Sequence, residues 1–370
     1  MGLYMEYRSY SEVRQQAQDW QDKVLGIICF SEFNPDSLNE IPEIHLNAPV
    51  LAGENIACEV WLSNITSATQ NKSSNQVLSG SKGAIQYRLD GELLFGVITL
   101  DELAFSPMQS QQAENKISPL QQATESAYRQ IFELIDELGY PHLYRFWNYM
   151  ANINEMSHDL ERYRQFNVGR KHILMQSGRE VGCDLPAACA LGLAKSPLSI
   201  AFLVGKTAAA AIENPRQIKA YDYPSQYGPR TPSFSRAVFL HNANQATLFI
   251  SGTASIVGHQ TQHVADVTAQ TKETLLNIEA LIAQANSTLS QPVFNLHDTF
   301  LRVYLRHAED LNIVCAELQN HLKSEVNALF IQADICRHEL LVEIEATIQY
   351  MAKPGAAELG VAKPGVAESA

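Results

Sequence analysis

The sequence predicts an α/β (α+β) protein in which a module of mixed β-sheet, with helices packed on one face, occurs twice. The first observation is the order of apolar runs in residues 235–345, which follows the pattern strand, strand, helix, strand, helix, strand. The second is an internal parallel. A helical pattern at 119–138 and a strand-like run at 143–147 match the pattern at 265–285 and the run at 299–303, and each of the two strands carries an arginine. The unit is much longer than a solenoid repeat, so a duplicated module explains it better.

A chain of 370 residues suits two or three units of ordinary domain size. We expect four segments: a mainly β region at 1–104, a first module at 105–220, a second module at 221–350 that ends in the most distinctive strand, and a disordered tail at 351–370. The tail repeats the short motif Lys-Pro-Gly and is small, polar and low in complexity.

Several individual elements can be predicted. Asp90-Gly91 separates two strand-like runs, which indicates a β-hairpin. Pro119 suits the first turn of a helix that runs to Leu138, and Gly139 suits its end. Further predictions are helices at 159–166 and 310–326 and strands at 24–30, 57–62, 143–149, 235–240, 248–254, 300–305 and 340–345. Short apolar runs occur at 185–193 and 199–204, and polar loops are expected at 64–83 and 107–118.

Composition limits the class of function. The formal net charge of −13 argues against nucleic acids and anionic membranes as partners, because both bind basic surfaces. No apolar run approaches the roughly 20 residues of a membrane span, and residues 1–22 contain no apolar signal segment. The six cysteines form no CxxC pair, and no histidines show HExxH spacing, so neither a metal site nor a disulfide framework is indicated. A reduced, cytoplasmic protein is expected.

The last predicted strand holds the most informative pair of residues, Glu343 and Glu345. Side chains two residues apart in a strand point to the same face of the sheet. Two adjacent carboxylates do not both ionise freely, so the pKa of one should rise, which can keep a carboxylic acid protonated for general-acid catalysis. The alternative is an edge strand with two solvated glutamates, and the pattern alone leaves both open.

Arginines and tyrosines suggest an anion site. Arg145 and Arg302 lie inside predicted strands, where each needs an anion or a pairing carboxylate. The segment 221–236 between the modules is rich in Pro, Tyr and Arg, which fits an ordered loop that binds a carboxylate. A surface loop with packing tyrosines is the alternative.

Residues 232–346 resemble the Rid (YjgF) fold. The resemblance rests on four stretches, at 232–237, 248–252, 270–278 and 342–346. Rid imine deaminases carry an arginine for the substrate carboxylate shortly before the last strand, and Ala328 stands near that place. Deaminase activity therefore becomes a secondary hypothesis. Rid proteins are trimers, and two Rid-like modules in one chain would supply part of that trimer interface within the chain, which is a pseudo-oligomeric arrangement. Both a monomer and a small homo-oligomer therefore remain open.

A second resemblance, to the chorismatases, covers residues 20–350. It rests on the stretches 144–149, 161–170, 221–236, 251–258 and 336–345. The resemblance implies chorismate as substrate, no metal or organic cofactor, and Glu343 as the acid that protonates the enolpyruvyl methylene so that pyruvate leaves. It implies Tyr163, Arg170, Tyr223 and Arg236 as substrate-binding residues, with Arg145, Tyr227, Arg230 and Arg302 as further candidates.

Cys336 resembles the cysteine of the branches that form hydroxybenzoate, although a small buried thiol without a role is the alternative. The expected products are pyruvate and 3-hydroxybenzoate and/or 4-hydroxybenzoate, a starter unit for a pigment or another secondary metabolite. Three alternatives remain: a hydrolase that forms a dihydroxycyclohexadiene carboxylate, a Rid-type imine deaminase, and a non-catalytic metabolite sensor.

Overall fold

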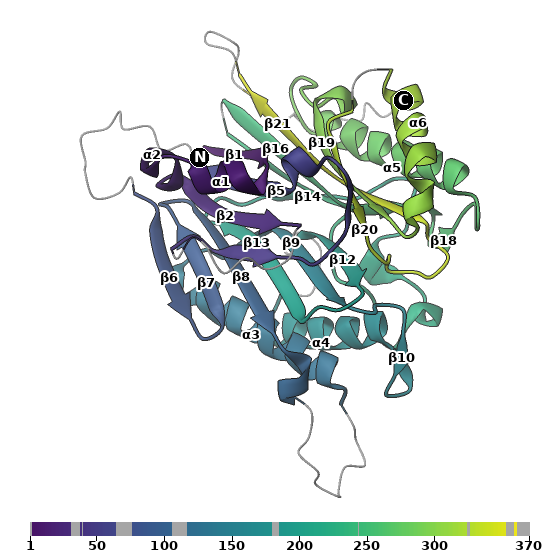
Figure 1. Ribbon diagram of the computed structural model, residues 1–370, viewed down its shortest axis with the longest axis horizontal. Coiled ribbons are helices and arrows are strands. Elements are labelled where there is room, and N and C mark those ends of the chain that lie inside the picture. The colour runs from purple at the N-terminus through teal and green to yellow at the C-terminus, as the bar shows by residue number, and fades with distance from the viewer. Residues whose placement is uncertain are drawn as a thin grey trace, which may run out of the picture.

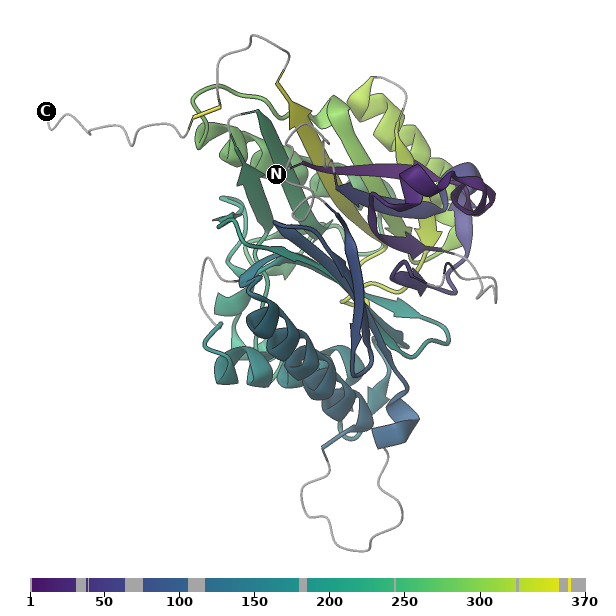
Figure 2. The same cartoon turned by 90° about the vertical axis from the view of Figure 1, so that its left-hand side faces the viewer.

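Three β-sheets surround one central core in the computed structural model, and long helices cover the outer faces of two of them (Figures 1 and 2). The structure describes residues 2–30, 38, 40–63, 76–105, 117–179, 185–242, 244–323, 326–352 and 359–360.

The N-terminal sheet has the strand order β1-β5-β2-β3. Its elements are β1 (Leu3–Arg8), β2 (Val24–Cys29), β3 (Glu43–His45) and β5 (Cys58–Ser63), with the short helices α1 (Tyr10–Gln15) and α2 (Gln18–Gln21). Cys29 and Cys58 lie opposite each other on antiparallel strands and form a disulfide. The expectation that no disulfide occurs was therefore wrong. The two cysteines meet only through strand pairing, and a separation of 29 residues gives no sequence signal.

The second sheet belongs to the first module and has the order β12-β9-β13-β8-β7-β6. Its strands are β6 (Leu78–Lys82), β7 (Ile85–Leu89), β8 (Leu93–Leu100), β9 (His142–Ala151), β12 (Ala187–Leu193) and β13 (Leu198–Gly205), and its helices are α3 (Pro119–Leu138) and α4 (Arg162–Gln176). The predicted hairpin at Asp90-Gly91 and the helix 119–138 are confirmed. Ser118 caps α3 by accepting a hydrogen bond from the Gln121 amide at 3.1 Å, and Gly139 ends it with φ +75°.

The third sheet belongs to the second module and has the order β14-β15-β16-β21-β19-β20-β4. Its strands are β4 (Val50–Ala52), β14 (Ala210–Ile212), β15 (Ala237–His241), β16 (Gln245–Ala254), β19 (Thr299–Leu305), β20 (Ala328–Gln332) and β21 (Val342–Met351), and its helices are α5 (Val267–Ser287) and α6 (Leu311–Leu322). Strand β20 was not predicted. Two short hairpins, β10 (Met156–Ser157) with β11 (Leu160–Glu161) and β17 (Ile256–Val257) with β18 (Gln260–Thr261), complete the strands described.

The two large sheets confirm the duplication. In chain order the first module is β6, β7, β8, α3, β9, α4, β12, β13, and the second is β14, β15, β16, α5, β19, α6, β20, β21. Equivalent strands lie in the same order in the two sheets: β6, β7, β8, β13, β9, β12 in the first and β14, β15, β16, β21, β19, β20 in the second. The last strand of each module, β13 or β21, therefore lies in the centre of its sheet. The sheets do not follow the boundary expected at residue 104, because β6 to β8 belong to the first module and β4 joins the second.

The core is divided by the sheets. One apolar cluster lies between all three sheets and includes Phe30, Trp61, Trp147 and Phe249. Separate clusters lie under α3 and α4 and under α5 and α6. The inner faces of both modules are therefore buried, so a polar side chain on an inner face needs a partner.

Several expected segments differ or fall outside the described residues. The predicted helix 159–166 begins at Arg162 and continues to Gln176, and the helix expected at 310–326 ends at Leu322. In the expected loop 64–83, residues 64–75 are not described and 78–82 form β6. Residues 106–116 and most of the tail are also outside the described residues. Leu359 in that tail is buried, and the Gly360 carbonyl accepts a hydrogen bond from the Ser290 amide. None of the described helices combines the length and the apolar composition needed to cross a membrane.

Candidate active site

Strand β21 carries Glu343 and Glu345 into the interior between the modules. The strand pairs with β16 on one side and β19 on the other, so the edge-strand alternative is wrong. The alternation is as predicted: Val342 and Ile344 face the core under the helices, while both carboxyl groups point to the opposite face. Glu343 is 3% exposed and Glu345 is 5% exposed.

Glu345 is bound by arginines from both modules. Its Oε2 lies 2.6 Å from Nη2 of Arg145 on β9 and 3.6 Å from Nη1 of Arg302 on β19, and its Oε1 accepts a hydrogen bond from Tyr304 at 3.1 Å. Burial alone would raise the pKa of Glu345, but the charges of Arg145 and Arg302 lower it below its ordinary value. The predicted need of both strand arginines for a carboxylate is thus met: Glu345 pairs with both, and Arg302 also pairs with Glu59.

Arg302 also connects the second module to the N-terminal sheet. Its guanidinium donates to the Glu59 carboxylate on β5 and to the Tyr149 hydroxyl at 2.9 Å, and it lies 4.9 Å from the centroid of the Phe30 ring. Since these protein groups surround it in the core, the structure does not place Arg302 among the groups that a substrate would contact. Arg145 likewise faces Glu345.

Glu343 lies in a different environment from its neighbour. Burial raises its pKa from 4.5 to about 8, and the charge of Glu345 acts in the same direction. The side chain fits because Gly252 lies beside it: a Cβ on residue 252 would overlap Oε1 of Glu343 and come within 3.3 Å of Cβ of Cys189. Strand β16 shifts register between Ile250 and Thr253, and this bulge gives room to the carboxyl group. One of the two glutamates is therefore protonated near neutral pH, as predicted.

The glutamate pair is not duplicated. In the second module Glu345 pairs with Arg302 and Glu343 pairs with Tyr304. In the first module Leu203 pairs with Arg145 and Ala201 pairs with Trp147. At these two positions the equivalent strand β13 thus carries apolar residues, whereas β21 carries the two acids.

Helix α4 brings a polar group toward Glu343, which we call the α4 group: Tyr163, Asn167 and Arg170. Arg170 is 2% exposed and donates to Oδ1 of Asn167 at 2.8 Å. Burial raises the pKa of the Tyr163 hydroxyl, and Cys336 and Glu343 are close enough to raise it further, while Arg170 lowers it. This hydroxyl is thus within electrostatic reach of both Arg170 and Glu343.

The segment between the modules contributes Tyr223 and Arg236 to a second polar group, and the segment before β21 contributes Arg337, whose guanidinium lies over the Tyr223 ring; we call these three residues the loop group. Residues 220–222 and 225–227 form two short 3-10 helices that turn the segment inward. Nη2 of Arg236 donates to the Tyr223 hydroxyl at 2.7 Å. The backbone carbonyl of Arg236 accepts from the Ser251 amide, so this arginine adjoins the bulge that carries Gly252. Arg230, in contrast, is exposed.

Arg337 was missed from the sequence. Its guanidinium lies 4.1 Å from the ring centroid of Tyr227 and 5.4 Å from that of Tyr223, and it donates to the His259 carbonyl at 2.9 Å. Tyr227 thus supports Arg337, and its hydroxyl bonds to the His259 carbonyl. In the sequence, the one indication that Arg337 belongs to the site is its position directly after Cys336.

Cys336 lies between these groups on the segment 333–341 that leads into β21. Burial and the charge of Glu343 raise the pKa of its thiol to about 12, with Arg337 opposing. Cys336 is therefore a neutral thiol at neutral pH. A second thiol, Cys189 on β12, hydrogen-bonds to Glu345 and is buried beneath the same site.

The arginines retain unused donors. Nε of Arg170, Nε of Arg236 and Nη2 of Arg337 are among the described buried donors that have no hydrogen-bond partner. Donors of Arg14, Arg145 and Arg302 outside the two groups belong to the same set. A buried donor without a partner costs about 1–3 kcal/mol, so such donors are rare unless a ligand completes them. The arrangement is a protonated carboxylic acid with arginine donors on two sides, which suits a substrate with two carboxylates. The described residues contain no cluster of His, Cys, Asp or Glu that could hold a metal ion.

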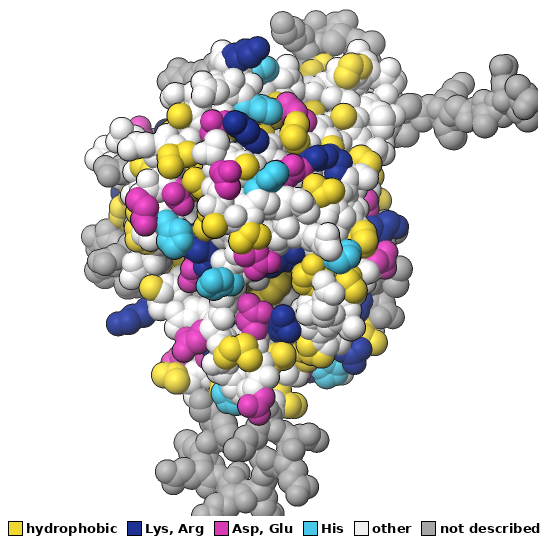
Figure 3. Space-filling view, turned by 90° about the vertical axis from the view of Figure 1, so that its right-hand side faces the viewer, with side chains coloured by type: hydrophobic (Ala, Val, Ile, Leu, Met, Phe, Trp, Pro, Cys, Tyr) yellow, Lys and Arg dark blue, Asp and Glu magenta, His cyan; other side chains and the backbone are white. Residues whose placement is uncertain are grey.

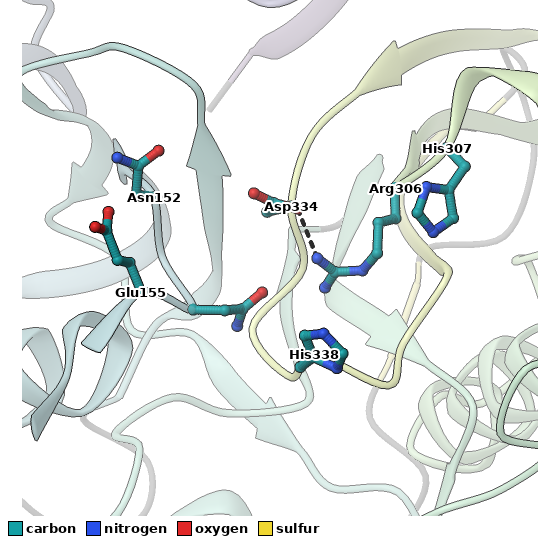
Figure 4. A pocket seen from close by; sticks show the side chains of 7 residues that line it. Asn152, Glu155, Arg306, His307, Asp334 and His338 are labelled. Atoms are coloured by element: carbon teal, nitrogen blue, oxygen red, sulfur yellow. Dashed lines mark hydrogen bonds and ion pairs between the residues drawn. The ribbon is translucent and has the colours of Figure 1, made fainter.

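A surface pocket of about 550 Å³ lies next to the segment 333–341 (Figure 4). Its lining is polar and comes from both modules: Asn152, Asn154, Glu155, Arg306, His307, Asp334 and His338. Figure 4 shows Arg306 facing Asp334, with Asn152 and Glu155 across the opening. On the molecular face in Figure 3, acidic, basic and histidine side chains are interspersed, and no single charge type predominates.

Family models match both modules. The model described as "Chorismatase FkbO/Hyg5-like, N-terminal" matches residues 70–204, and the model described as "Endoribonuclease L-PSP" matches residues 230–350. The first range spans the strands from β6 to β13, and the second spans those from β15 to β21 without β14. The fold and the site define an α/β enzyme built from a duplicated Rid-like module.

Similarity to individual proteins shows which family within this class of enzymes the chain resembles. The 3-hydroxybenzoate synthase of Streptomyces hygroscopicus is 30% identical over 339 residues, which cover 88% of this chain and 91% of that protein. A chorismatase of Streptomyces rapamycinicus is 39% identical over 232 residues, or 61% of this chain and 69% of that protein. A chorismatase crystal structure matches with a TM-score of 0.76 and 30% identity, over 94% of this chain and 98% of that one. The chain belongs to the chorismatase family, as the sequence motifs predicted.

Proposed function

We propose that this protein converts chorismate to pyruvate and 3-hydroxybenzoate and/or 4-hydroxybenzoate. The observation that supports this most strongly is Glu343, a buried glutamic acid whose pKa is raised to about 8, near two groups of arginines with unused donors. Chorismate carries two carboxylates and an enolpyruvyl ether, so it requires two anion subsites and an acid between them. The relatives named 3-hydroxybenzoate synthase and chorismatase act as further support.

In this proposal Glu343 donates its proton to the methylene carbon of the enolpyruvyl group. The ether carbon then becomes an oxocarbenium-like centre. The bond between the ring and the ether oxygen breaks with its electron pair going to that oxygen, so pyruvate leaves as a ketone, and the ring loses one proton to ionised Glu343 as it becomes aromatic. A carboxyl group with a pKa near 8 is mostly protonated at pH 7, yet it is a strong enough acid to share its proton in the transition state. Glu345, kept ionised by Arg145 and Arg302, holds the proton on Glu343 and also offers a nearby negative charge.

Two carboxylate subsites follow from the arginine groups. The α4 group offers Arg170 and the Tyr163 hydroxyl, and the loop group offers Arg236 and Arg337, with Tyr223 holding Arg236. Arginines in fixed positions bind carboxylates with direction as well as charge. Because the donors are already in place, little reorganisation is needed when the substrate binds.

The product depends on water. Loss of pyruvate from chorismate gives a hydroxybenzoate without added water, whereas hydrolysis to a dihydroxycyclohexadiene carboxylate consumes one water molecule. Cys336 lies near Glu343 as a neutral thiol, so in our proposal it excludes water or offers an S–H donor, and does not act as a thiolate base. This favours hydroxybenzoate as the product.

Chromatography of a chorismate reaction tests the proposal. We expect pyruvate and hydroxybenzoate in equal amounts, and Cys336→Ala should increase the share of pyruvate that is not matched by hydroxybenzoate. No pyruvate above the uncatalysed background would refute the proposal. Formation of pyruvate and dihydroxycyclohexadiene carboxylate in equal amounts would support the proposed action on chorismate but refute hydroxybenzoate as the product.

A further inference from the structure

One arginine outside the two anion-binding groups contacts the backbone on both sides of Cys336. Arg306 follows strand β19, is mostly buried, and reaches back across the segment 333–341. Its Nη2 donates to the carbonyl of Ile335 at 3.1 Å and to that of Arg337 at 3.0 Å. These are the two residues that flank Cys336, so a single nitrogen binds the carbonyl of the residue before the thiol and that of the residue after it.

The same guanidinium makes two further bonds. Nε donates to the Leu340 carbonyl at 2.8 Å, and Nη1 lies 2.6 Å from the Asp334 carboxylate, the ion pair drawn in Figure 4. All three nitrogens of Arg306 are therefore used on one seven-residue segment. A lysine has one nitrogen on a flexible stem and cannot reproduce this fork.

The ends of the segment are held independently. Asp334 exchanges two backbone hydrogen bonds with Gly192 of β12, at 2.7 and 2.8 Å. At the other end, Gln270 of α5 donates to the Glu339 carbonyl at 2.9 Å and accepts from the Leu341 amide at 2.8 Å. Between these points the segment has no regular strand or helix. The Ile335 carbonyl before Cys336 takes its hydrogen bond from Arg306, and the Arg337 carbonyl accepts from Arg306 and also from the Leu340 amide at 3.1 Å.

We propose that Arg306 is a positioning residue for the reaction: it holds residues 334–340 in the conformation that presents Cys336 and Arg337 to Glu343. Arg306 itself need not contact the substrate. This inference rests on the proposed function of the Glu343 site, since Cys336 and Arg337 matter for turnover only if that site acts on chorismate.

The chain offers a matched control in Arg88. This arginine is also buried and also binds three backbone carbonyls, those of Gln21, Val24 and Glu40, at 2.7, 3.0 and 2.9 Å. It lies on β7 against the N-terminal sheet, away from Glu343. Arg88→Lys should therefore lower the thermal midpoint much as Arg306→Lys does, without moving any group of the site.

The experiment compares Arg306→Lys with Arg88→Lys in three readouts: thermal midpoint, turnover of chorismate with product identity, and the rate at which iodoacetamide labels Cys336, measured by peptide mass spectrometry. For Arg306→Lys we expect kcat to fall roughly 10- to 100-fold, as for other displaced catalytic groups. We also expect less hydroxybenzoate per pyruvate and faster labelling of Cys336. In Arg88→Lys, the turnover of chorismate, the products and the labelling rate of Cys336 should all match those of the wild type.

Equal behaviour of the two variants would overturn the inference, and so would faster labelling without a change in kcat or product. The labelling readout does not depend on chorismate. If the wild-type protein releases no pyruvate, the proposed function fails, while unchanged labelling in Arg306→Lys would separately refute the role of Arg306 in holding the segment.

Discussion

Gly252 and Glu343 are in direct contact across the bulge of β16, so close that a methyl group on residue 252 would occupy the space of the glutamate carboxyl group. Gly252→Ala should displace this carboxyl group and leave the strands intact, because the flexible end of a side chain can move and the backbone need not. We expect kcat to fall roughly 100-fold with little change in thermal midpoint.

Gly360→Ala is the control for this substitution. A Cβ there would lie 3.6 Å from Oγ of Ser290, an ordinary contact, so activity and stability should remain at wild-type values. Full activity in Gly252→Ala would show that the position of Glu343 next to Gly252 has no importance for turnover.

Burial of Glu343 and the charge of Glu345 together should raise the alkaline limit of activity. If protonated Glu343 is required, kcat/KM falls as pH rises through the pKa of about 8. Glu345→Gln removes a negative charge that raises this pKa and leaves Arg145 to stabilise ionised Glu343. The alkaline limb of the pH–rate profile should therefore move to lower pH.

Glu43→Gln is the matched control, since Glu43 is also held by an arginine, Arg14 at 2.8 Å, but belongs to the N-terminal sheet. Its pH–rate profile should coincide with that of the wild type. An alkaline limb that stays in place in Glu345→Gln, or moves to higher pH, would contradict the proposed coupling of the two glutamates.

Arg170 and Arg230 should differ in their effect on substrate binding. Both were candidates from the sequence, but Arg170 is buried with an unused Nε and Arg230 is exposed. Arg170→Gln removes a charged partner of a carboxylate and should raise KM by about 10- to 100-fold, the range for a hydrogen bond to a charged group. Arg230→Gln should leave KM within about twofold, because an exposed charge contributes little. Steady-state kinetics measures both KM values. A larger rise in KM for Arg230→Gln than for Arg170→Gln would refute the assignment of Arg170 to substrate binding.

The buried pair of Arg302 and Glu59 should govern stability. Arg302→Met leaves Glu59 and Glu345 without their shared cation in the core and should lower the free energy of unfolding by about 3–5 kcal/mol. Urea denaturation measures this. The exposed pair of Lys82 and Glu137 provides the comparison, since Lys82→Met should cost less than about 1 kcal/mol. Equal losses in both variants would contradict the central place of Arg302.

Local patterns allowed much of the fold to be predicted. Helix α3 was predicted with its ends because Pro119 and Gly139 each have a specific local role. The shared face of Glu343 and Glu345 followed from the period of a strand alone. The duplication was visible because a helix and an arginine-bearing strand recur in the same order, and the sheets show the same recurrence.

Contacts between distant segments could not be predicted. Gly252 is recognised as important only because β16 and β21 are neighbours, and Cys29 meets Cys58 only through strand pairing. Arg302 had the residue type of a substrate-binding group, but Glu59, 243 positions earlier in the chain, binds it in the core. Spacing along the sequence contains no information on which of several arginines a distant carboxylate will neutralise.

Glu343→Gln tests the central claim most directly. Glutamine keeps the shape of the side chain and removes only the acidic proton, so chorismate should still bind, with a dissociation constant within about threefold of the wild-type KM, while the rate of pyruvate release should fall by at least roughly 100-fold, the lower range for a general acid. Calorimetry and a pyruvate assay on the same preparation give both values. Pyruvate release by Glu343→Gln at the wild-type rate would contradict the account.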